Sequence, residues 1–189
     1  MKKIILPAVA SALLFSGTAS AANTIEFLGE ITDSTCDVVL EGPSATTVTL
    51  PTVSKTNLPT ANSTAGRTVF ALQASGCTLA NNKTKVAAFF NANSTEGADI
   101  NNVDQASGYL NNLASASPAE NVKLRLIDGT SGNVIKVGYT DQMTSTSGVT
   151  VDASGNARMP YAVEYIATAA EGAKAGAVRG VVVYDLMYQ

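Results

Sequence analysis

The sequence contains no histidine and no tryptophan, and only 14% of its residues are charged. Histidine is the side chain that most often serves as a general base and as a metal ligand, so triads that use it are excluded. No phosphate-binding glycine loop, dinucleotide-binding glycine run or EF-hand spacing is present. The acidic pairs Asp99 with Asp104 and Asp141 with Asp152 lie in polar stretches typical of solvated loops. We therefore expect no enzymatic activity, no metal site and no cofactor.

Long hydrophobic runs are also missing. The longest apolar stretch, residues 4–15, is too short to cross a bilayer, because a spanning helix needs about 20 residues. Lys2 and Lys3 precede this stretch, and the small-residue triplet 19–21 follows it. This order is typical of a secretory signal peptide, which we predict at residues 1–21. A retained membrane anchor would leave the triplet unexplained, so we expect an exported mature chain without a membrane span.

Basic residues are too few for a nucleic-acid partner. The predicted signal peptide removes two of the twelve basic residues, which leaves ten against fifteen acidic ones and a net charge of −5. About 168 residues remain, enough for one domain with its own core. Few aromatic residues and many small polar ones are typical of a β-rich extracellular protein.

The chain has only two cysteines, Cys36 and Cys77. In an exported protein an even count predicts a disulfide, and a redox-active pair would more often be spaced C-x-x-C. Closing a loop of about 40 residues restricts the unfolded chain and stabilises the fold by roughly 3 to 4 kcal/mol.

Alternation of apolar and polar residues at period two predicts many short strands. The candidate strands are residues 25–31, 37–40, 47–50, 68–74, 85–91, 122–126, 134–137, 161–165 and 178–188. Asp128 and Gly129 form a turn signal that predicts a hairpin between the strands on either side. The polar stretch 91–120 is predicted to be a loop with at most one short helical turn. Together these patterns predict an all-β fold, an antiparallel sandwich.

Both ends of the mature chain carry alternating patterns. The C-terminal one is the strongest in the sequence: Val178, Gly180, Val182, Tyr184, Leu186 and Tyr188. The N-terminal one places Ile25, Phe27, Gly29 and Ile31 on one face. Both segments can be the outer strands of one self-contained sandwich, and this interpretation stays open. Gly29 argues against it, because glycine weakens an ordinary strand and often marks the close approach of another backbone.

Several of these features together resemble a known family, the type 1-like major fimbrial (pilus) subunits of the chaperone-usher pathway. The resemblance lies in residues 24–31, in the two cysteines that follow, and in residues 158–168, which are similar to the family's penultimate strand. It also lies in the ending, where Gly176 is fourteen residues from the C-terminus and Tyr188 is penultimate. The resemblance covers essentially the whole mature chain.

The resemblance implies that residues 36–189 form an immunoglobulin-like domain lacking its final strand. An apolar groove would lie open beside the C-terminal strand, and its edge would contact a chaperone or a donor strand through Gly176, Val178, Gly180, Val182, Tyr184, Leu186 and Tyr188. It implies that residues 22–35 are a donor-strand extension whose Ile25, Phe27, Gly29 and Ile31 fill the groove of another copy. Gly29 would lie where the groove is shallow, the position at which exchange is thought to begin in the family.

The resemblance also implies the partners and the location. The partners would be further copies of the chain and related pilins, a periplasmic chaperone and the outer-membrane usher. The location would be a cell-surface fimbrium that supports bacterial adhesion, reached through the periplasm. Two alternatives remain: a minor or adaptor pilin of the same system, and a self-contained secreted β-sandwich binding module. The module would fold as a stable monomer without a chaperone.

Overall fold

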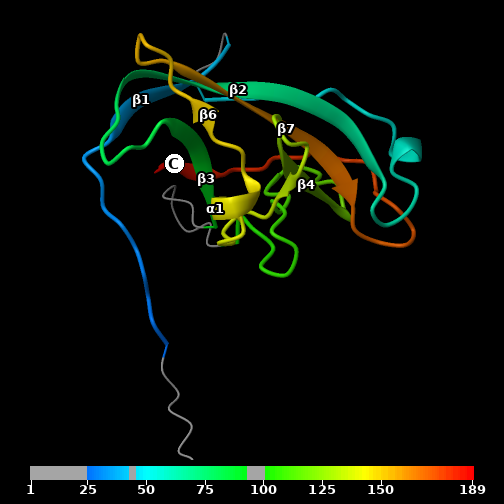
Figure 1. The fold of residues 1–189 in the computed structure, drawn as a ribbon. Helices are drawn as coiled ribbons and strands as arrows, with labels where there is room; N and C mark the ends of the chain where they lie inside the picture. The colour runs from blue at the N-terminus through cyan, green and yellow to red at the C-terminus, as the bar shows by residue number, and fades with distance from the viewer. Residues whose placement is uncertain (1–24, 43–45, 93–100) are drawn as a thin grey trace, which may run out of the picture. The chain divides into compact units, whose positions relative to one another are not determined.

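The computed structural model describes residues 25–42, 46–92 and 101–189 (Figure 1). The predicted signal peptide, residues 1–21, lies outside these residues. The chain divides into a unit that ends at Ile31 and a compact unit from Thr32 to Gln189. In the first unit, residues 25–31 belong to no helix or strand, so the strand predicted there does not form within this chain. An isolated strand has no partner for its backbone groups, and period-two alternation cannot reveal that lack.

The compact unit is built almost entirely of strands. They are β1 (Thr35–Leu40), β2 (Thr64–Thr78), β3 (Lys85–Asn91), β4 (Val122–Asp128), β5 (Val134–Ile135), β6 (Val149–Thr150), β7 (Ala157–Ala167) and β8 (Val183–Tyr188). Two short helices accompany them, the 3-10 helix η1 (Lys55–Asn57) and the α-helix α1 (Gln142–Ser145). In the described part of the chain, no helix has the length and hydropathy to cross a membrane.

The strands form two sheets. One has five strands in the order β1-β2-β7-β4-β5, and the other has three in the order β6-β3-β8. Every ladder in both sheets is antiparallel, which confirms the predicted fold class. The predicted hairpin is also confirmed, since β4 and β5 pair through Leu126 and Ile135. Figure 1 shows the long strands β2 and β7 running side by side along the five-stranded sheet.

The core lies between the sheets. Strand β4 shows why the period-two pattern is informative: Val122 and Leu124 are buried, whereas Lys123 and Arg125 between them are half-buried. From the other sheet, Phe90 packs edge-on against Tyr161, with ring centroids 5.1 Å apart. Such perpendicular aromatic pairs add to the stabilisation that burial provides.

The outer face of the five-stranded sheet carries a buried acid. Glu164 is only 3% exposed, and it accepts hydrogen bonds from Arg67 Nε at 2.8 Å and from Arg125 Nε at 2.6 Å. Burial raises the pKa of Glu164, but the two guanidinium groups outweigh burial and leave this pKa below its ordinary value. The carboxylate therefore links β2, β7 and β4 across the sheet.

The predicted disulfide is present. Cys36 in β1 and Cys77 in β2 are joined, with an S–S distance of 2.09 Å. The bond ties the edge strand β1 to its neighbour.

Two predictions of strand position in the compact unit were wrong. Residues 47–50 form no strand, and the C-terminal strand begins at Val183 rather than at residue 178. In both stretches apolar side chains such as Val48 and Val178 still pack against the core, as the alternating pattern predicts. They form no strand because no described neighbouring strand pairs with their backbone. The stretch 91–120 was predicted to be a loop with at most one short helical turn, and its described part contains no helix; α1 lies later in the chain. A β-bridge between Val103 and Leu110 fixes the loop without a helix.

Candidate strand-accepting groove

The C-terminal strand β8 has one unpaired edge. It pairs with β3 from Val86 opposite Tyr188 to Asn91 opposite Val183, and no other described strand joins it. The predicted groove residues Tyr184, Leu186 and Tyr188 therefore pack against the core but stay half-buried. An apolar strand at a sheet edge is a template for another strand.

Residues 46–53 share the same core cluster as β8. Val48 and Leu50 of this extended segment pack against that cluster and are also half-buried. Among the described residues, no backbone-to-backbone hydrogen bond links residues 46–53 to another segment. We define the groove as the apolar surface that residues 36–42 and 46–53 form on one side and residues 178–188 on the other. Its two sides carry backbone groups that lack strand partners.

The two ends of the groove differ. At one end a cavity of about 330 Å³ lies between Val53 and Val178, with Tyr165, Leu58 and Val122 among its lining residues. At the other end the C-terminal strand approaches β1. Burial there raises the pKa of Tyr188, and a backbone hydrogen bond from Cys36 opposes this shift.

The core is already filled at the level of Gly180. A Cβ atom at this position would lie 2.8 Å from Leu124 Cδ1 and 3.5 Å from Leu110 Cδ1. The sequence pattern placed Gly180 among the groove residues, but it did not identify the two leucines. Their positions follow from the loop before β4, which runs antiparallel to β4 at Leu110 and Leu124.

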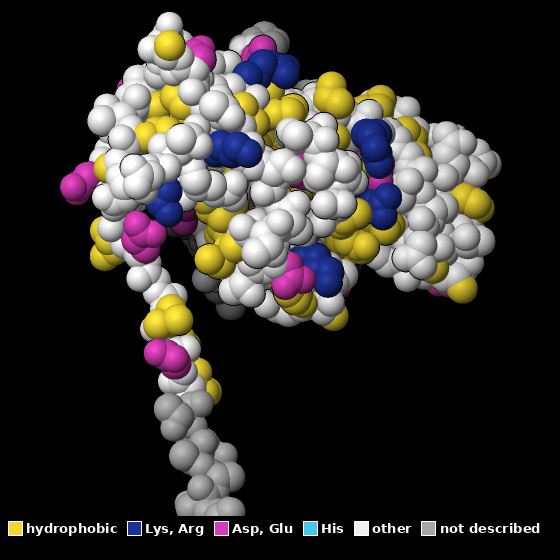
Figure 2. All heavy atoms as spheres, viewed as in Figure 1, with side chains coloured by type: hydrophobic (Ala, Val, Ile, Leu, Met, Phe, Trp, Pro, Cys, Tyr) yellow, Lys and Arg dark blue, Asp and Glu magenta, His cyan; other side chains and the backbone are white. Residues whose placement is uncertain are grey.

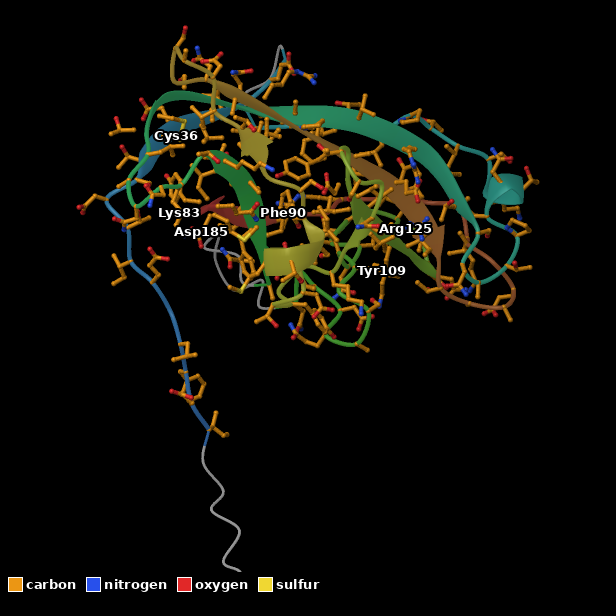
Figure 3. All side chains as sticks on the ribbon, in the orientation of Figure 1. Cys36, Lys83, Phe90, Tyr109, Arg125 and Asp185 are labelled. Carbon is orange, nitrogen blue, oxygen red and sulfur yellow. A yellow bond between two sulfur atoms is a disulfide. The ribbon has the colours of Figure 1, made fainter. Side chains whose placement is uncertain are left out.

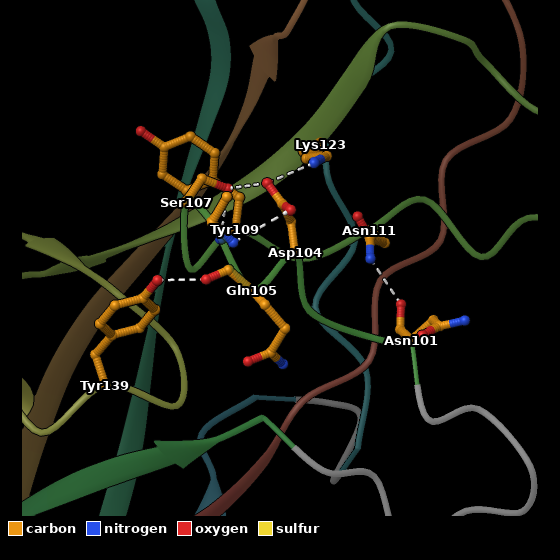
Figure 4. Close-up of polar contacts among 9 residues, drawn as sticks. Asn101, Asp104, Gln105, Ser107, Tyr109, Asn111, Lys123 and Tyr139 are labelled. Atoms are coloured by element: carbon orange, nitrogen blue, oxygen red, sulfur yellow. Dashed lines mark hydrogen bonds and ion pairs between the residues drawn. The ribbon is translucent and has the colours of Figure 1, made fainter.

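That loop is held by polar contacts (Figure 4). Asp104 accepts a hydrogen bond from Ser107 Oγ at 2.6 Å and forms an ion pair with Lys123 Nζ at 2.7 Å. Lys123 and then Ser107 are the main causes that lower the pKa of Asp104 to about 2. The Tyr139 hydroxyl donates to the carbonyl of Gln105. These contacts fix the loop that carries Leu110.

Residues 176–179 form no strand, and an asparagine side chain adds to the backbone hydrogen bonds that hold them in place. Asn112 Nδ2 donates to the carbonyls of Ala119 and Ala177, both at 2.9 Å, and Asn112 Oδ1 accepts from the Arg179 N–H at 3.0 Å. At Gly176 a Cβ atom would lie 2.4 Å from the Ala119 nitrogen, so only glycine fits this close approach. Sequence reasoning identified Gly176 and missed Asn112, because a loop asparagine carries no distinguishing pattern.

The opposite edge of the three-stranded sheet is closed without a full strand. Strand β6 pairs only with Lys85 and Val86 of β3. Beyond it, the Ala88 N–H donates to the Tyr161 hydroxyl at 2.8 Å. Phe90, labelled in Figure 3, uses both backbone groups: its N–H donates to Gln142 Oε1 at 2.9 Å, and its carbonyl accepts from Gln142 Nε2 at 3.0 Å.

Gln142 is fully buried, so its amide replaces a strand partner inside the protein. Burial is also the main cause that raises the pKa of Tyr161 to about 12. Sequence reasoning placed Tyr161 in a strand but did not identify its hydrogen bond, and it found no role for Gln142.

The N-terminal segment 25–31, which we call the arm, presents uncovered apolar side chains. Ile25, Phe27 and Ile31 are 78%, 90% and 99% exposed, and a Cβ atom at Gly29 would meet nothing within 4 Å. Large apolar side chains left in water lose the stabilisation that burial would give them. The structure describes this segment only by itself, so the predicted contact with a groove remains a prediction.

Charged side chains are sparse on the surface. On the face that Figure 2 shows, the described basic and acidic side chains are scattered and interspersed with uncharged ones. Within the residues described, no group of three or more potential ligands could hold a metal ion.

Comparison with known proteins relates the sequence to fimbrial subunits. A family profile described as "FimA: Type-1 fimbrial protein, A" matches residues 50–189. The "Major fimbrial subunit SMF-1" of Stenotrophomonas maltophilia (strain K279a) is 40% identical over 172 residues, which cover 89% of this chain and 94% of that protein. The "Minor fimbrial subunit HifD" of Haemophilus influenzae is 32% identical over 171 residues, which cover 87% of this chain and 73% of that protein.

Two solved structures share the fold. The P pilus rod subunit PapA superposes with a TM-score of 0.54 at 14% identity, over 82% of this chain and 99% of that one. A chain from a chaperone-usher pilus, solved to explain rod uncoiling, superposes with a TM-score of 0.56 at 17% identity, over 90% and 97%. These likenesses concern the fold alone. With the sequence matches, they lead to one conclusion: the chain belongs to the type-1 fimbrial protein family and is a structural subunit of fimbriae.

Proposed function

We propose that the chain polymerises by donor-strand exchange, in which the groove of one copy takes up the arm of another. The observation that carries this proposal is the unpaired apolar edge at β8, in a chain that also carries an exposed apolar arm. A strand placed in the groove would find backbone groups without strand partners on both sides. Main-chain pairing then supplies affinity, and alternate side chains supply register.

The arm fits the groove best as an antiparallel strand, because every ladder in both sheets is antiparallel. Ile31 would enter the cavity beside Val178. Gly29 would then lie opposite Gly180, where Leu110 and Leu124 leave no room for a side chain. Phe27 and Ile25 follow opposite Val182 and Tyr184.

This alignment places Ile31 at the cavity and the glycine at the level where the core is filled. Burying Ile25, Phe27 and Ile31 contributes roughly 1.5 to 3 kcal/mol each, and each strand hydrogen bond adds about 1 kcal/mol.

The contact joins the groove of one copy to the arm of the next, so it does not close on itself. A head-to-tail contact of this kind generates a filament. Before assembly the β8 edge must be covered to prevent aggregation, which is the role we assign to a periplasmic chaperone. Export through the predicted signal peptide, residues 1–21, and delivery to an outer-membrane usher complete this proposal.

A shaft subunit is favoured over a minor or adaptor subunit. The major subunit SMF-1 is matched at 40% identity over 94% of its length, whereas the minor subunit HifD is matched at 32% over 73%. A self-contained binding module is the weaker candidate, because residues 25–31 form no strand of their own.

The test is removal of the arm. A mature chain lacking residues 22–31 should still form a soluble one-to-one complex with a fimbrial chaperone, since its groove is intact. It should not donate a strand to a second copy. A full-length chain with Glu26→Gln, which changes only the polar face of the arm, serves as the control and should form fibres. Fibres of normal length from the arm-deleted chain would overturn the proposal.

A further inference from the structure

The face of the arm that would point away from the groove carries Glu26, Leu28 and Glu30. Leu28 and Glu30 complement outward-facing side chains of residues 178–188. In the alignment that places Gly29 opposite Gly180, Glu30 lies directly opposite Arg179, and Leu28 lies opposite Val181. We propose that Glu30 of one copy and Arg179 of the next form an ion pair that, with the Leu28–Val181 contact, fixes the register of the inserted arm. This inference rests on the proposed donor-strand exchange.

Arg179 is positioned for such a contact. Its N–H is bonded to Asn112 Oδ1 at 3.0 Å, and its carbonyl accepts from the Leu113 N–H at 2.7 Å. Its backbone is thus anchored by the neighbouring loop. The Arg179 residue is exposed, and its guanidinium makes no hydrogen bond or ion pair with another residue in the described part of the chain. The Arg179 guanidinium therefore lies beside the groove on a backbone that is held in place.

Several neighbouring alignments lose the match. Moving the arm by two residues keeps its apolar face inward but places Glu30 opposite Val181 or Ala177, away from Arg179. A parallel arm with Gly29 still opposite Gly180 sets Leu28 against Arg179 and Glu30 against Val181. Moving the arm by one residue turns its apolar face outward. Among the alignments with Gly29 opposite the filled level at Gly180, the antiparallel one is that in which charge meets charge and apolar meets apolar.

The expected effect is modest and depends on salt. An exposed cross-strand pair of opposite charge changes an equilibrium by roughly two- to fivefold, and like charges in the same positions have an opposite effect of similar size. Screening at high ionic strength removes most of this difference. The large part of the affinity comes from the apolar face, so loss of the pair should slow exchange without abolishing it.

The first test is a charge swap in the complete mature chain. Complexes of each variant with the chaperone are mixed, and the rate of strand exchange is followed at low and high salt. Glu30→Lys alone and Arg179→Glu alone should each slow exchange by about two- to fivefold at low salt, and the double variant should recover the original rate. Glu26→Lys is the matched control, because position 26 lies opposite Val183; Arg179→Glu should not rescue it.

The second test reads the register directly. Copies carrying Leu28→Cys and Val181→Cys should become linked by disulfides along the fibre, whereas Leu28→Cys combined with Arg179→Cys should not. Linkage of the offset pair, or equal exchange rates for the single and double charge variants, would overturn the inference. These results would leave the proposed function standing, since that fails only if the arm-deleted chain polymerises.

Discussion

Adding a side chain at Gly29 should block exchange while leaving the subunit folded. In a Gly29→Leu variant the new side chain would point into the groove at the level of Gly180, where Leu124 and Leu110 already fill the core. Forcing extra methylenes into a filled core costs about 1 to 3 kcal/mol, which corresponds to exchange that is slower by roughly 5- to 150-fold. A Cβ atom at Gly29 meets nothing within 4 Å in the donor, so the donor's own fold is unaffected.

The assay is a time course of polymer formation from chaperone complexes, followed by gel electrophoresis and electron microscopy. Glu26→Leu adds the same side chain to the opposite face of the arm and is the matched control. An acceptor carrying Leu124→Val, which removes one methylene near Gly180, should recover part of the lost rate. If Gly29→Leu formed fibres at the unmodified rate, Gly29 would not lie opposite Gly180, or the groove would have room for a side chain at that level.

Three further predictions concern the folded domain. Replacing Cys36 and Cys77 by serine should lower the free energy of unfolding by about 2 to 5 kcal/mol in a denaturant titration, with little change if the bond contributed nothing. Because the folded-state pKa of Glu164 lies below its unfolded value, its contribution to stability is present above the unfolded pKa and is lost as pH falls through the folded one. Urea midpoints between pH 7 and pH 3 should therefore fall less steeply for Glu164→Gln, and parallel curves would contradict this. Gln142→Leu should speed amide hydrogen exchange at Phe90, whereas unchanged exchange would mean that the buried amide does not protect this edge.

Local patterns in the sequence predicted the features that a short stretch of residues determines by itself, such as single strands and turns. Residues 85–91 were predicted to form a strand, and β3 has these same bounds. Asp128 and Gly129 signalled the turn between β4 and β5. The disulfide followed from compartment and count, since an exported chain with two cysteines has one possible internal pairing.

Features that depend on partners in space could not be predicted in this way. Residues 47–50 and 178–182 alternate like strands, yet a strand also needs a neighbouring edge, and no spacing reports one. The filled level at Gly180 depends on Leu110, which is far away in the sequence and is held by Asp104 and its contacts. The unpaired edge of β8 was expected only through a family resemblance.

The amide of Gln142 and the hydroxyl of Tyr161 have a consequence for how many neighbours a subunit can have. Because they already satisfy both backbone groups of Phe90 and the N–H of Ala88, the described part of β3 beyond β6 has no free N–H on that side for a further strand, and the proposed donor strand would pair with β8. Under the proposed exchange, a subunit that accepts one arm and donates one arm would bind two neighbours. In the proposed assembly such subunits would add end to end in an unbranched fibre, and the number of copies would set its length.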